Sequence, residues 1–333
     1  MTVSHSKYIL VTGGAGYIGS HTCKMLKSRG YEPVTFDNLS NGHKHAVKWG
    51  PLVEGDLKDI HAVRAVFDHY KFSAVIHFAS FIEVGESVQT PEKYYANNVI
   101  GSLNLLNVMK EYQVHDLVFS SSCAVYGSPE IVPITEDTPQ HPINPYGHSK
   151  MMVEQILQDF SVAHDLRYVS CRYFNACGSD PDLEIGEEHD PETHIIPIAL
   201  MSAAGKRDSF KIYGTDYSTE DGTCVRDYIH VHDLANAHIA ALEYLERGGQ
   251  NDAFNLGTGR GYSVKQILEK VKEITGRSLH IEEQSRRPGD PPTLIAETKK
   301  VKTILNFQPE MSDLDTIIQT AWNFYCQRNT HSK

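Results

Sequence analysis

The sequence predicts an α/β fold organised as a doubly wound parallel sheet, and three observations support this prediction. Short apolar runs of strand length alternate with amphipathic runs of helical length, a glycine-rich turn follows the first strand, and small polar residues follow later strands. Repeated βα units of this kind form parallel sheets covered by helices, because the crossovers between parallel strands are right-handed. A chain of 333 residues is long enough for one large domain or two smaller ones.

The composition argues against several classes of function. The net charge is −11, from 31 basic and 42 acidic residues, so a general nucleic-acid binder is not expected. No apolar run reaches the length of a membrane span, and Met1–Lys7 lacks the apolar core of a signal peptide. The six cysteines show no CxxC spacing, which predicts reduced thiols, no metal site and a cytoplasmic location.

The first βαβ unit carries a dinucleotide-binding motif. We expect a strand at Tyr8–Thr12, a helix that opens at the glycine loop Gly13–Gly19, and a second strand at Pro33–Phe36. Asp37 follows that strand, eighteen residues after the loop. Glycines let the backbone approach a pyrophosphate, and the helix N-terminus favours its negative charge. Asp37 would bind the adenosine ribose and repel a 2′-phosphate, which selects NAD over NADP.

The βα alternation continues to about residue 175. Strands are expected at 74–79, 117–121 and 167–173, and helices at 59–69, 91–112 and 147–164. Ligands of such sheets lie at the carboxyl ends of the strands, where Asp56, Phe78–Ser80 and Ser120–Ser122 fall. For Asp56 alone, a helix cap is an equal alternative. Residues 1–175 are therefore predicted to form an NAD-binding Rossmann domain.

The pattern changes after residue 175. The stretch 178–192 is acidic and rich in glycine and proline, which predicts a loop. Beyond it, strands are expected at 210–213 and 253–256 and helices at 232–247, 264–275 and 313–327. Residues 176–333 are predicted to form mainly a smaller α/β lobe that binds the substrate, although some of its elements could return to the main sheet.

Two clusters of polar residues in this second part are interpreted as structural. His230 and His232 could form a metal pair, but no third ligand is evident, and Asp233 is expected to cap a helix. The acidic segment Glu184–Asp190 lacks the spacing of a calcium loop and is expected to be solvated.

The stretch Tyr146–Lys150 places a tyrosine and a lysine on one face of a predicted helix. A cation beside a phenol favours the phenolate, which can take a proton from a sugar hydroxyl while a cofactor takes the hydride. The alternative is that Tyr146 is an ordinary helix-start aromatic and Lys150 a solvated charge.

Motifs along nearly the whole chain carry a family resemblance. The chain resembles the extended short-chain dehydrogenase/reductase family in the segments TGGAGYIG, SSSCAVYG and YGHSK. The chain further resembles the UDP-hexose 4-epimerase branch, from Tyr8 to about Phe324, in HFASFIEVGESV, YYANNVIGSLNLL, SKMMVEQIL, RYFNACG, STEDGTCVRDYIHVHDLA and RRPGDPP. The resemblance implies that UDP-galactose and UDP-glucose are interconverted with tightly held NAD. A 4-keto sugar would turn over within the site before the hydride returns.

The resemblance also implies roles for individual residues. Tyr146 is the base, Lys150 lowers the Tyr146 pKa and binds the nicotinamide ribose, and Ser122 hydrogen-bonds the reacting oxygen. The cofactor-binding positions are Gly13, Gly16, Tyr17, Ile18, Gly19, Asp37, Asn38, Asn41, Asp56, Leu57, Phe78, Ala79, Asn97, Tyr146, Lys150 and Phe174. The substrate-binding positions are Ser122, Tyr146, Asn175, His194, Arg226, Arg287 and Asp290. A homodimer formed through the helices at 91–112 and 147–164 is also implied.

The sequence departs from the family pattern near the sugar. Cys123 and Ala124 stand where many members have alanine and threonine, and Ile82 stands where some have lysine. Leu294 occupies a position that often decides whether an N-acetyl group fits, and His194 stands where some members have asparagine. An epimerase of UDP-pentoses, UDP-glucuronate or N-acetylated UDP-sugars is therefore an alternative.

Two further alternatives remain at this stage. A nucleotide-sugar dehydratase or decarboxylase shares the fold, but a dehydratase commonly carries Asp-Glu where this chain has Cys123 and Ala124. An NAD-binding sensor without activity could dispense with Tyr146, Lys150 and Ser122, which are all present.

Overall fold

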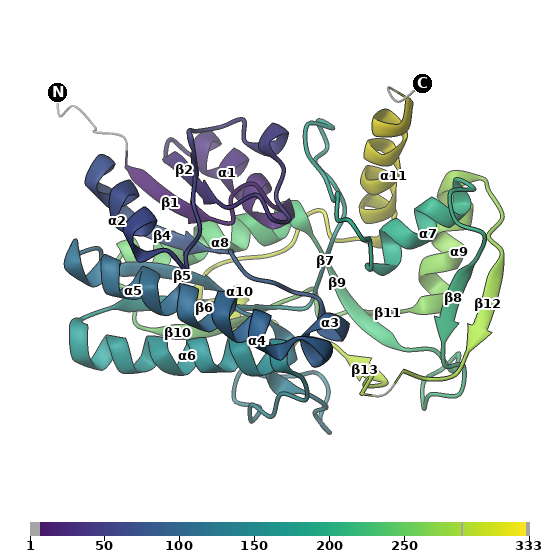
Figure 1. Cartoon of the computed structure of the whole chain (residues 1–333). Helices are drawn as coiled ribbons and strands as arrows, with labels where there is room; N and C mark the ends of the chain where they lie inside the picture. Colours follow the sequence, from purple (N-terminus) through teal and green to yellow (C-terminus); the bar gives the residue numbers. More distant parts are fainter. Residues whose placement is uncertain (1–6, 288, 331–333) are drawn as a thin grey trace.

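The computed structural model describes residues 7–287 and 289–330. Its centre is a parallel sheet in the strand order β10-β6-β5-β4-β1-β2-β3 (Figure 1). These strands are β1 (Tyr8–Thr12), β2 (Glu32–Asp37), β3 (Leu52–Glu54), β4 (Phe72–His77), β5 (Asp116–Ser120), β6 (Arg167–Tyr173) and β10 (Asp252–Leu256). The chain runs from β1 to one edge and then from β4 to the other, so the sheet is doubly wound, as predicted. A ligand cleft is expected where the direction reverses, between β1 and β4.

Helices cover both faces of this sheet. The first layer contains α1 (Tyr17–Ser28) and α8 (Val231–Glu246), and the second contains α2 (Ile60–His69), α5 (Gly101–Glu111) and α6 (Pro145–His164). Ile9 belongs to the core under α1 and α8, whereas Leu10 belongs to the core under α2, α5 and α6. Because successive strand residues point to opposite faces, β1 is buried on both sides and anchors the glycine loop.

The segment predicted as one helix at 91–112 has a change of helical type inside it. It consists of α4 (Pro91–Tyr94), a π-helical stretch η2 (Tyr95–Ile100) and α5. Short π-helical stretches are frequent at functional sites. Here the stretch includes Asn98, whose side-chain amide donates to the Phe81 carbonyl and to the Ser149 hydroxyl, both at 3.0 Å. The distortion thereby joins this helix to the start of α6.

Part of the second half of the chain belongs to the main sheet. Strand β10 pairs in parallel with β6, and α10 (Lys299–Ile304) packs against β10. The smaller lobe contains β7 (Asn175–Cys177), β8 (Phe210–Tyr213), β9 (Val225–His230), β11 (Gly261–Ser263), β12 (Ile281–Gln284), β13 (Thr293–Leu294), α7 (Ile195–Ala203), α9 (Val264–Thr275) and α11 (Leu314–Thr330). The division of cofactor and substrate binding at residue 175 stays a prediction.

Two local expectations are corrected by the structure. Strand β4 ends at His77 rather than at residue 79, since the chain leaves the sheet to form the pocket wall. Helix α8 is capped by His230, because Asp233 instead accepts hydrogen bonds from Glu310, Met311 and Ser312. Several elements were not predicted from the sequence: the strands β3, β7, β9, β11, β12 and β13, the helices α7 and α10, and the short elements α3 (Val84–Gln89), η1 (Lys44–Ala46) and η3 (Cys123–Tyr126).

Two further findings concern the membrane and the thiols. Within the described ranges, no helix combines the length and apolarity that a membrane crossing requires. Cys23, Cys123, Cys171, Cys177 and Cys224 are free thiols.

Candidate active site

A pocket of about 430 Å³ lies at the carboxyl ends of the central strands, between the main sheet and the smaller lobe. Nearly all of the predicted site residues line it. These are Gly13, Gly16, Tyr17, Ile18, Gly19, Asp37, Asn38, Asn41, Asp56, Leu57, Phe78, Ala79, Asn97, Ser122, Tyr146, Phe174, Asn175, His194, Arg226 and Asp290. Lys150 and Arg287 are not among its lining residues.

The glycine loop brings backbone, rather than side chains, to one end of the pocket. Gly13 has φ +73°, and a Cβ there would lie 2.6 Å from the Ala79 nitrogen. A Cβ on Gly19 would overlap the Gly13 carbonyl oxygen, so the loop closes only with glycine at both positions. Gly16 begins α1 without a side-chain cap. The first amide groups of α1 are therefore available to an anion such as a pyrophosphate.

The Asp37 carboxylate lies at the end of β2 and is 7% exposed. One of its oxygens accepts from the Ala15 amide at 3.0 Å, and the other accepts from the Leu39 amide at 2.8 Å. Burial raises the Asp37 pKa, and these two hydrogen bonds only partly offset the increase. Each oxygen keeps a lone pair that a ribose hydroxyl could use. The donor set thus fits an adenosine ribose, and its charge disfavours a 2′-phosphate.

Asn38 and Asp56 form the neighbouring part of the pocket. The Asn38 amide donates to the Asp56 carboxylate at 3.2 Å, and the Lys58 amide donates to the same group at 2.8 Å. Helix α2 is capped by Asp59, not by Asp56. Asp56 is therefore left as a pocket residue, where the sequence alone left its role open.

Tyr146 is positioned by the start of α6. The Asn144 side chain caps this helix by accepting from the Gly147 amide at 2.8 Å, and Pro145 occupies its first turn. A Cβ on Gly147 would lie 2.7 Å from the Ala124 carbonyl oxygen, so glycine lets α6 approach η3 closely. The same turn of η3 is held by Ser122, whose hydroxyl accepts from the Ala124 amide at 3.1 Å. Ser122 and Tyr146 are thereby brought to one pocket wall.

Lys150 lies beneath this wall and is fully buried. Its Nζ donates to the Ser80 hydroxyl at 2.8 Å and to the Ser120 carbonyl at 2.7 Å. Nζ also lies 5.9 Å from the centre of the Tyr146 ring. Burial lowers the Lys150 pKa to about 7, partly opposed by the charge of Glu154. The Lys150 ammonium therefore loses its proton at a lower pH than an exposed lysine does.

The main influence on the pKa of Tyr146 differs from the one that the sequence suggested. Burial raises it well above 10, the nearby Tyr173 adds to the increase, and a hydrogen bond with Ser122 lowers it. The largest influence is therefore burial and not the ammonium of Lys150. That Lys150 lowers the Tyr146 pKa stays a prediction.

The substrate-binding positions come from several elements of the smaller lobe. Arg226 is on β9, and the Asn175 amide at the start of β7 donates to the Asp227 carbonyl at 3.0 Å. Asp290 lines the pocket and accepts from Arg287 Nε at 2.8 Å. The Arg287 side chain is 60% exposed, so it reaches the pocket rim through Asp290.

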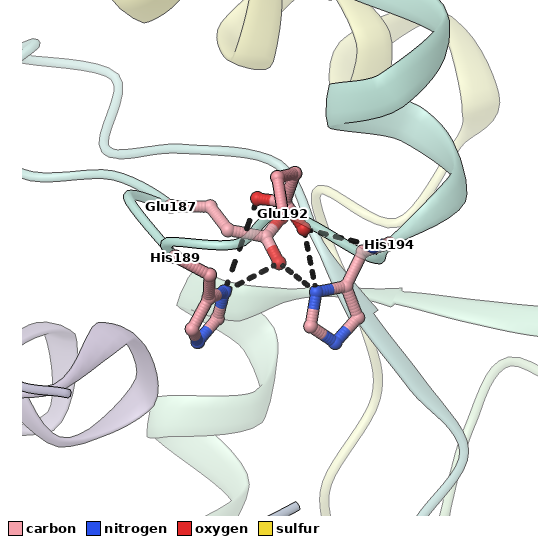
Figure 2. Close-up of side chains that lie close together, drawn as sticks. All are labelled: Glu187, His189, Glu192 and His194. Atoms are coloured by element: carbon pink, nitrogen blue, oxygen red, sulfur yellow. Dashed lines mark hydrogen bonds and ion pairs between the residues drawn. The ribbon is translucent and has the colours of Figure 1, made fainter. Parts of the chain in front are cut away.

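One acidic and one basic residue of the pocket were not predicted from the sequence. Glu187 and His189 line the pocket beside His194, although the segment 184–190 was expected to be solvated (Figure 2). The physical reason is that Glu187 forms ion pairs with His189 and His194. Because its charge has partners inside the fold, the loop can turn inward instead of remaining solvated. The available signal was a repeated Glu-x-His pattern, at 187–189 and again at 192–194.

The charges of this loop are coupled. Burial raises the Glu187 pKa, but the contacts with His194 and His189 together outweigh this effect and bring the pKa down to about 2. Burial lowers the His194 pKa, but Glu187 and Glu192 together outweigh this effect and raise the pKa well above 6.5. Glu187 is therefore ionised at neutral pH.

The geometry agrees with comparisons to known proteins. The family model described as "NAD dependent epimerase/dehydratase family" matches residues 9–257. A relative from Rhizobium meliloti named UDP-glucose 4-epimerase is 51% identical over 96% of this chain and 98% of its own length. Another so named, from Halalkalibacterium halodurans, is 48% identical and covers 95% of each chain.

A solved structure supports the same assignment. The UDP-glucose 4-epimerase from Brucella ovis in complex with NAD has a TM-score of 0.94 and 52% identity, covering 96% of this chain and 98% of that one. The fold and the site together define a Rossmann-type enzyme that uses a dinucleotide. The chain belongs to the NAD dependent epimerase/dehydratase family.

Proposed function

We propose that this protein is an isomerase that interconverts UDP-galactose and UDP-glucose with NAD as its bound cofactor. One observation carries the proposal: Tyr146 and Ser122 share a pocket with the glycine loop and Asp37. Such a pocket can hold a sugar carbon against a nicotinamide while the nucleotide parts are bound at its ends. The names of the relatives, UDP-glucose 4-epimerase, support the choice of reaction.

The reaction requires a reversible proton transfer at the hydroxyl of carbon 4. The chemistry that bound NAD supplies is acceptance of a hydride from that carbon and its return to the opposite face. The Tyr146 oxygen would take the hydroxyl proton and later give it back, so one group serves both directions. The Ser122 hydroxyl would donate to the oxygen as negative charge develops on it. Lys150, held by Ser80 and Ser120, would supply the positive charge that favours the phenolate.

The nucleotide end of the substrate would be held by the smaller lobe. Arg226 offers the paired donors that suit a diphosphate, and Asp290 offers oxygens that suit the uridine ribose. Arg287 would close the rim over them, because its guanidinium is already bonded to Asp290. Asn175 and His194 would contact the substrate between this end and Tyr146.

The side chains around the sugar favour epimerisation over dehydration. Elimination of water needs an acid/base pair beside the sugar, and the pocket has Cys123 and Ala124 at the corresponding wall. Burial raises the pKa of the Cys123 thiol to about 12, so it is a poor general base at neutral pH. Leu294 also lines the pocket and leaves N-acetylated sugars as an alternative substrate.

The decisive experiment is incubation of the purified protein with UDP-galactose without added NAD, followed by detection of UDP-glucose. Conversion supports both the reaction and a cofactor retained through purification. Conversion only after NAD is added supports the reaction with a loosely held cofactor. Absence of conversion in both cases contradicts the proposal, and UDP-pentoses, UDP-glucuronate and UDP-N-acetylhexosamines would then be compared.

We further propose that the protein is a cytoplasmic homodimer. Ile100, Leu103 and Met152 are large apolar residues exposed on the adjacent η2, α5 and α6 surfaces, which supports an interface there. The double substitution of Ile100→Asp with Leu103→Asp should convert the dimer to monomers in light-scattering measurements. Ile131→Asp, at an exposed apolar residue outside these helices, is the matched control. A monomeric unsubstituted protein would contradict the proposed dimer.

A further inference from the structure

The loop between β7 and α7 ends in a cluster of two histidines and two glutamates, which we name the Glu187 cluster. Its members, Glu187, His189, Glu192 and His194, point toward one another (Figure 2). One ligand atom from each residue lies within 4.8 Å of all the others. Among the described residues, this is one of two groups with that property. The cluster adjoins the pocket, but the proposed epimerase chemistry uses only His194.

The cluster buries two carboxylates without a lysine or an arginine. The side chains of Glu187 and Glu192 are only 6% and 8% exposed, and their ion pairs among the described residues are with His189 and His194. Two carboxylates so buried need a compensating charge, because an unpaired buried charge is costly. Neutral imidazoles do not supply it. The occupant must be either a proton on histidine or a cation.

The second group of acidic residues shows how the chain otherwise solves this problem. Asp180, Asp182 and Glu184 surround the ammonium of Lys24, with Nζ to oxygen distances of 2.7, 2.8 and 2.8 Å. That group therefore carries its own cation and has no need of a metal. The Glu187 cluster replaces the lysine with two imidazole nitrogens, which are metal ligands as well as bases.

The distances in the Glu187 cluster suit a tetrahedral metal. Zinc bonds to nitrogen and oxygen near 2.1 Å place neighbouring ligand atoms about 3.4 Å apart. In the cluster, Nδ1 of His194 lies 2.9 Å from Oε1 of Glu187 and from Oε1 of Glu192. Nδ1 of His189 lies 3.2 Å from Oε1 of Glu187 and 4.0 Å from Oε2 of Glu192. These separations bracket the tetrahedral value. Small side-chain movements would therefore allow one ion to bind to all four residues of the cluster.

The orientation of two members also favours a metal over a hydrogen-bonded network. Nδ1 of His189 is buried and lies 3.2 Å from a Glu187 oxygen, but this approach does not have the geometry of a hydrogen bond. Glu192 is held by the backbone. Its Oε1 accepts hydrogen bonds from the Thr193 and His194 amides, both at 2.8 Å. The same oxygen, Oε1, lies 2.9 Å from His194 Nδ1, and Oε2 lies 4.0 Å from His189 Nδ1. The backbone bonds therefore orient the carboxylate with one oxygen near each histidine.

We propose that the Glu187 cluster binds one divalent transition-metal ion, with Zn²⁺ as the best match to two imidazoles and two carboxylates. The ion would fix the loop that borders the cofactor pocket to the start of α7. That loop already contacts the Rossmann part through Lys24 and through His43, which bonds the Glu188 carbonyl at 2.8 Å. The His189 ring also packs edge-on against Tyr17, with ring centres 6.1 Å apart. The inference does not depend on the proposed epimerase reaction.

The test uses the untagged full-length protein, purified with its cofactor and stripped with a chelator. Zn²⁺ binding is measured by competition with a chromogenic chelator, and Co²⁺ is used as a spectroscopic probe. We expect one equivalent of Zn²⁺ and the intense visible absorption of tetrahedral Co²⁺, bleached when Zn²⁺ is added. Glu187→Gln and His189→Gln should each lower the Zn²⁺ affinity at least about tenfold. The matched control, Asp182→Asn in the group around Lys24, should leave it unchanged.

Several outcomes would overturn the proposal. If the unsubstituted protein binds no Zn²⁺, a proton on histidine is the occupant and the metal site is wrong. Equal binding by the two variants places any bound metal elsewhere. An octahedral Co²⁺ spectrum contradicts the four-ligand site even if a variant fails to fold, because that measurement needs no substitution.

Discussion

The glycine loop 13–19 and the loop 178–194 border the same pocket, but they contribute to it in different ways. The first presents backbone amides, and its shape depends on close approaches that only glycine allows at Gly13 and Gly19. The second presents the polar side chains of Glu187, His189 and His194, which are held by one another. A backbone site is specified by a short stretch of sequence, whereas a side-chain site needs a loop to fold inward.

The largest expected effect concerns the reacting group beside the first region. Tyr146→Phe should keep bound NAD but lower turnover by about a thousandfold or more, because the phenol is the proposed proton acceptor. Turnover from UDP-galactose and the NAD content of the purified variant are the two measurements. Tyr168→Phe, on β6 and outside the pocket lining, is the matched control. Substantial turnover in Tyr146→Phe would exclude it as the base.

The next effect tests the buried charge of Lys150. Its pKa is about 7 in the folded protein, and the unfolded value is near 10.4, so between these values the unfolded state binds more protons. The stability of the unsubstituted protein relative to Lys150→Met should therefore rise with pH, by about 1.4 kcal/mol for each unit above 7. This gain in stability relative to Lys150→Met disappears as the pH falls to 7. Urea unfolding of both proteins at pH 7 and pH 9 measures it. A pH-independent difference would contradict the lowered pKa.

The glycine loop itself can be broken by one methyl group. Gly19→Ala would place a Cβ against the Gly13 carbonyl oxygen and should destabilise the protein by about 1–3 kcal/mol, with loss of retained NAD. Chemical denaturation and NAD content after purification measure these effects. Gly85→Ala, where a Cβ meets nothing within 4 Å, is the control and should keep NAD. If both variants retain NAD equally, the loop is not a tight backbone site.

The smallest expected effect concerns the smaller lobe, where side chains set the space around the sugar. Leu294→Ala removes bulk from the pocket wall and should raise the preference for UDP-N-acetylglucosamine over UDP-glucose about tenfold. The ratio of kcat/KM for the two sugars measures the change. An unaltered ratio would mean that another residue limits the space.

The accuracy of the sequence predictions followed this difference between the two regions. The boundaries of β1 and β2 were predicted within one residue, and α1 opens within the glycine loop as predicted, because apolar runs and glycines specify these features locally. The π-helical stretch η2 was not predicted. Its Asn98 contacts Phe81 and Ser149, which lie 17 and 51 residues away in the sequence, so no local pattern indicates these contacts. The expectation of a solvated loop at Glu184–Asp190 holds for its exposed ends but is wrong for Glu187 and His189, because their partners lie within the fold.

By itself, the sequence determined the doubly wound sheet, the glycine loop that opens α1 and the positions of Tyr146 and Ser122 at element ends. Those features depend on periodicity, glycine conformation and helix starts, which are local properties. Only the tertiary structure decided that burial dominates the pKa of Tyr146 and Lys150, and that Glu187 and His189 meet His194 at the pocket. Desolvation and contacts between distant segments exist only once the chain has packed, so no short stretch of sequence encodes them.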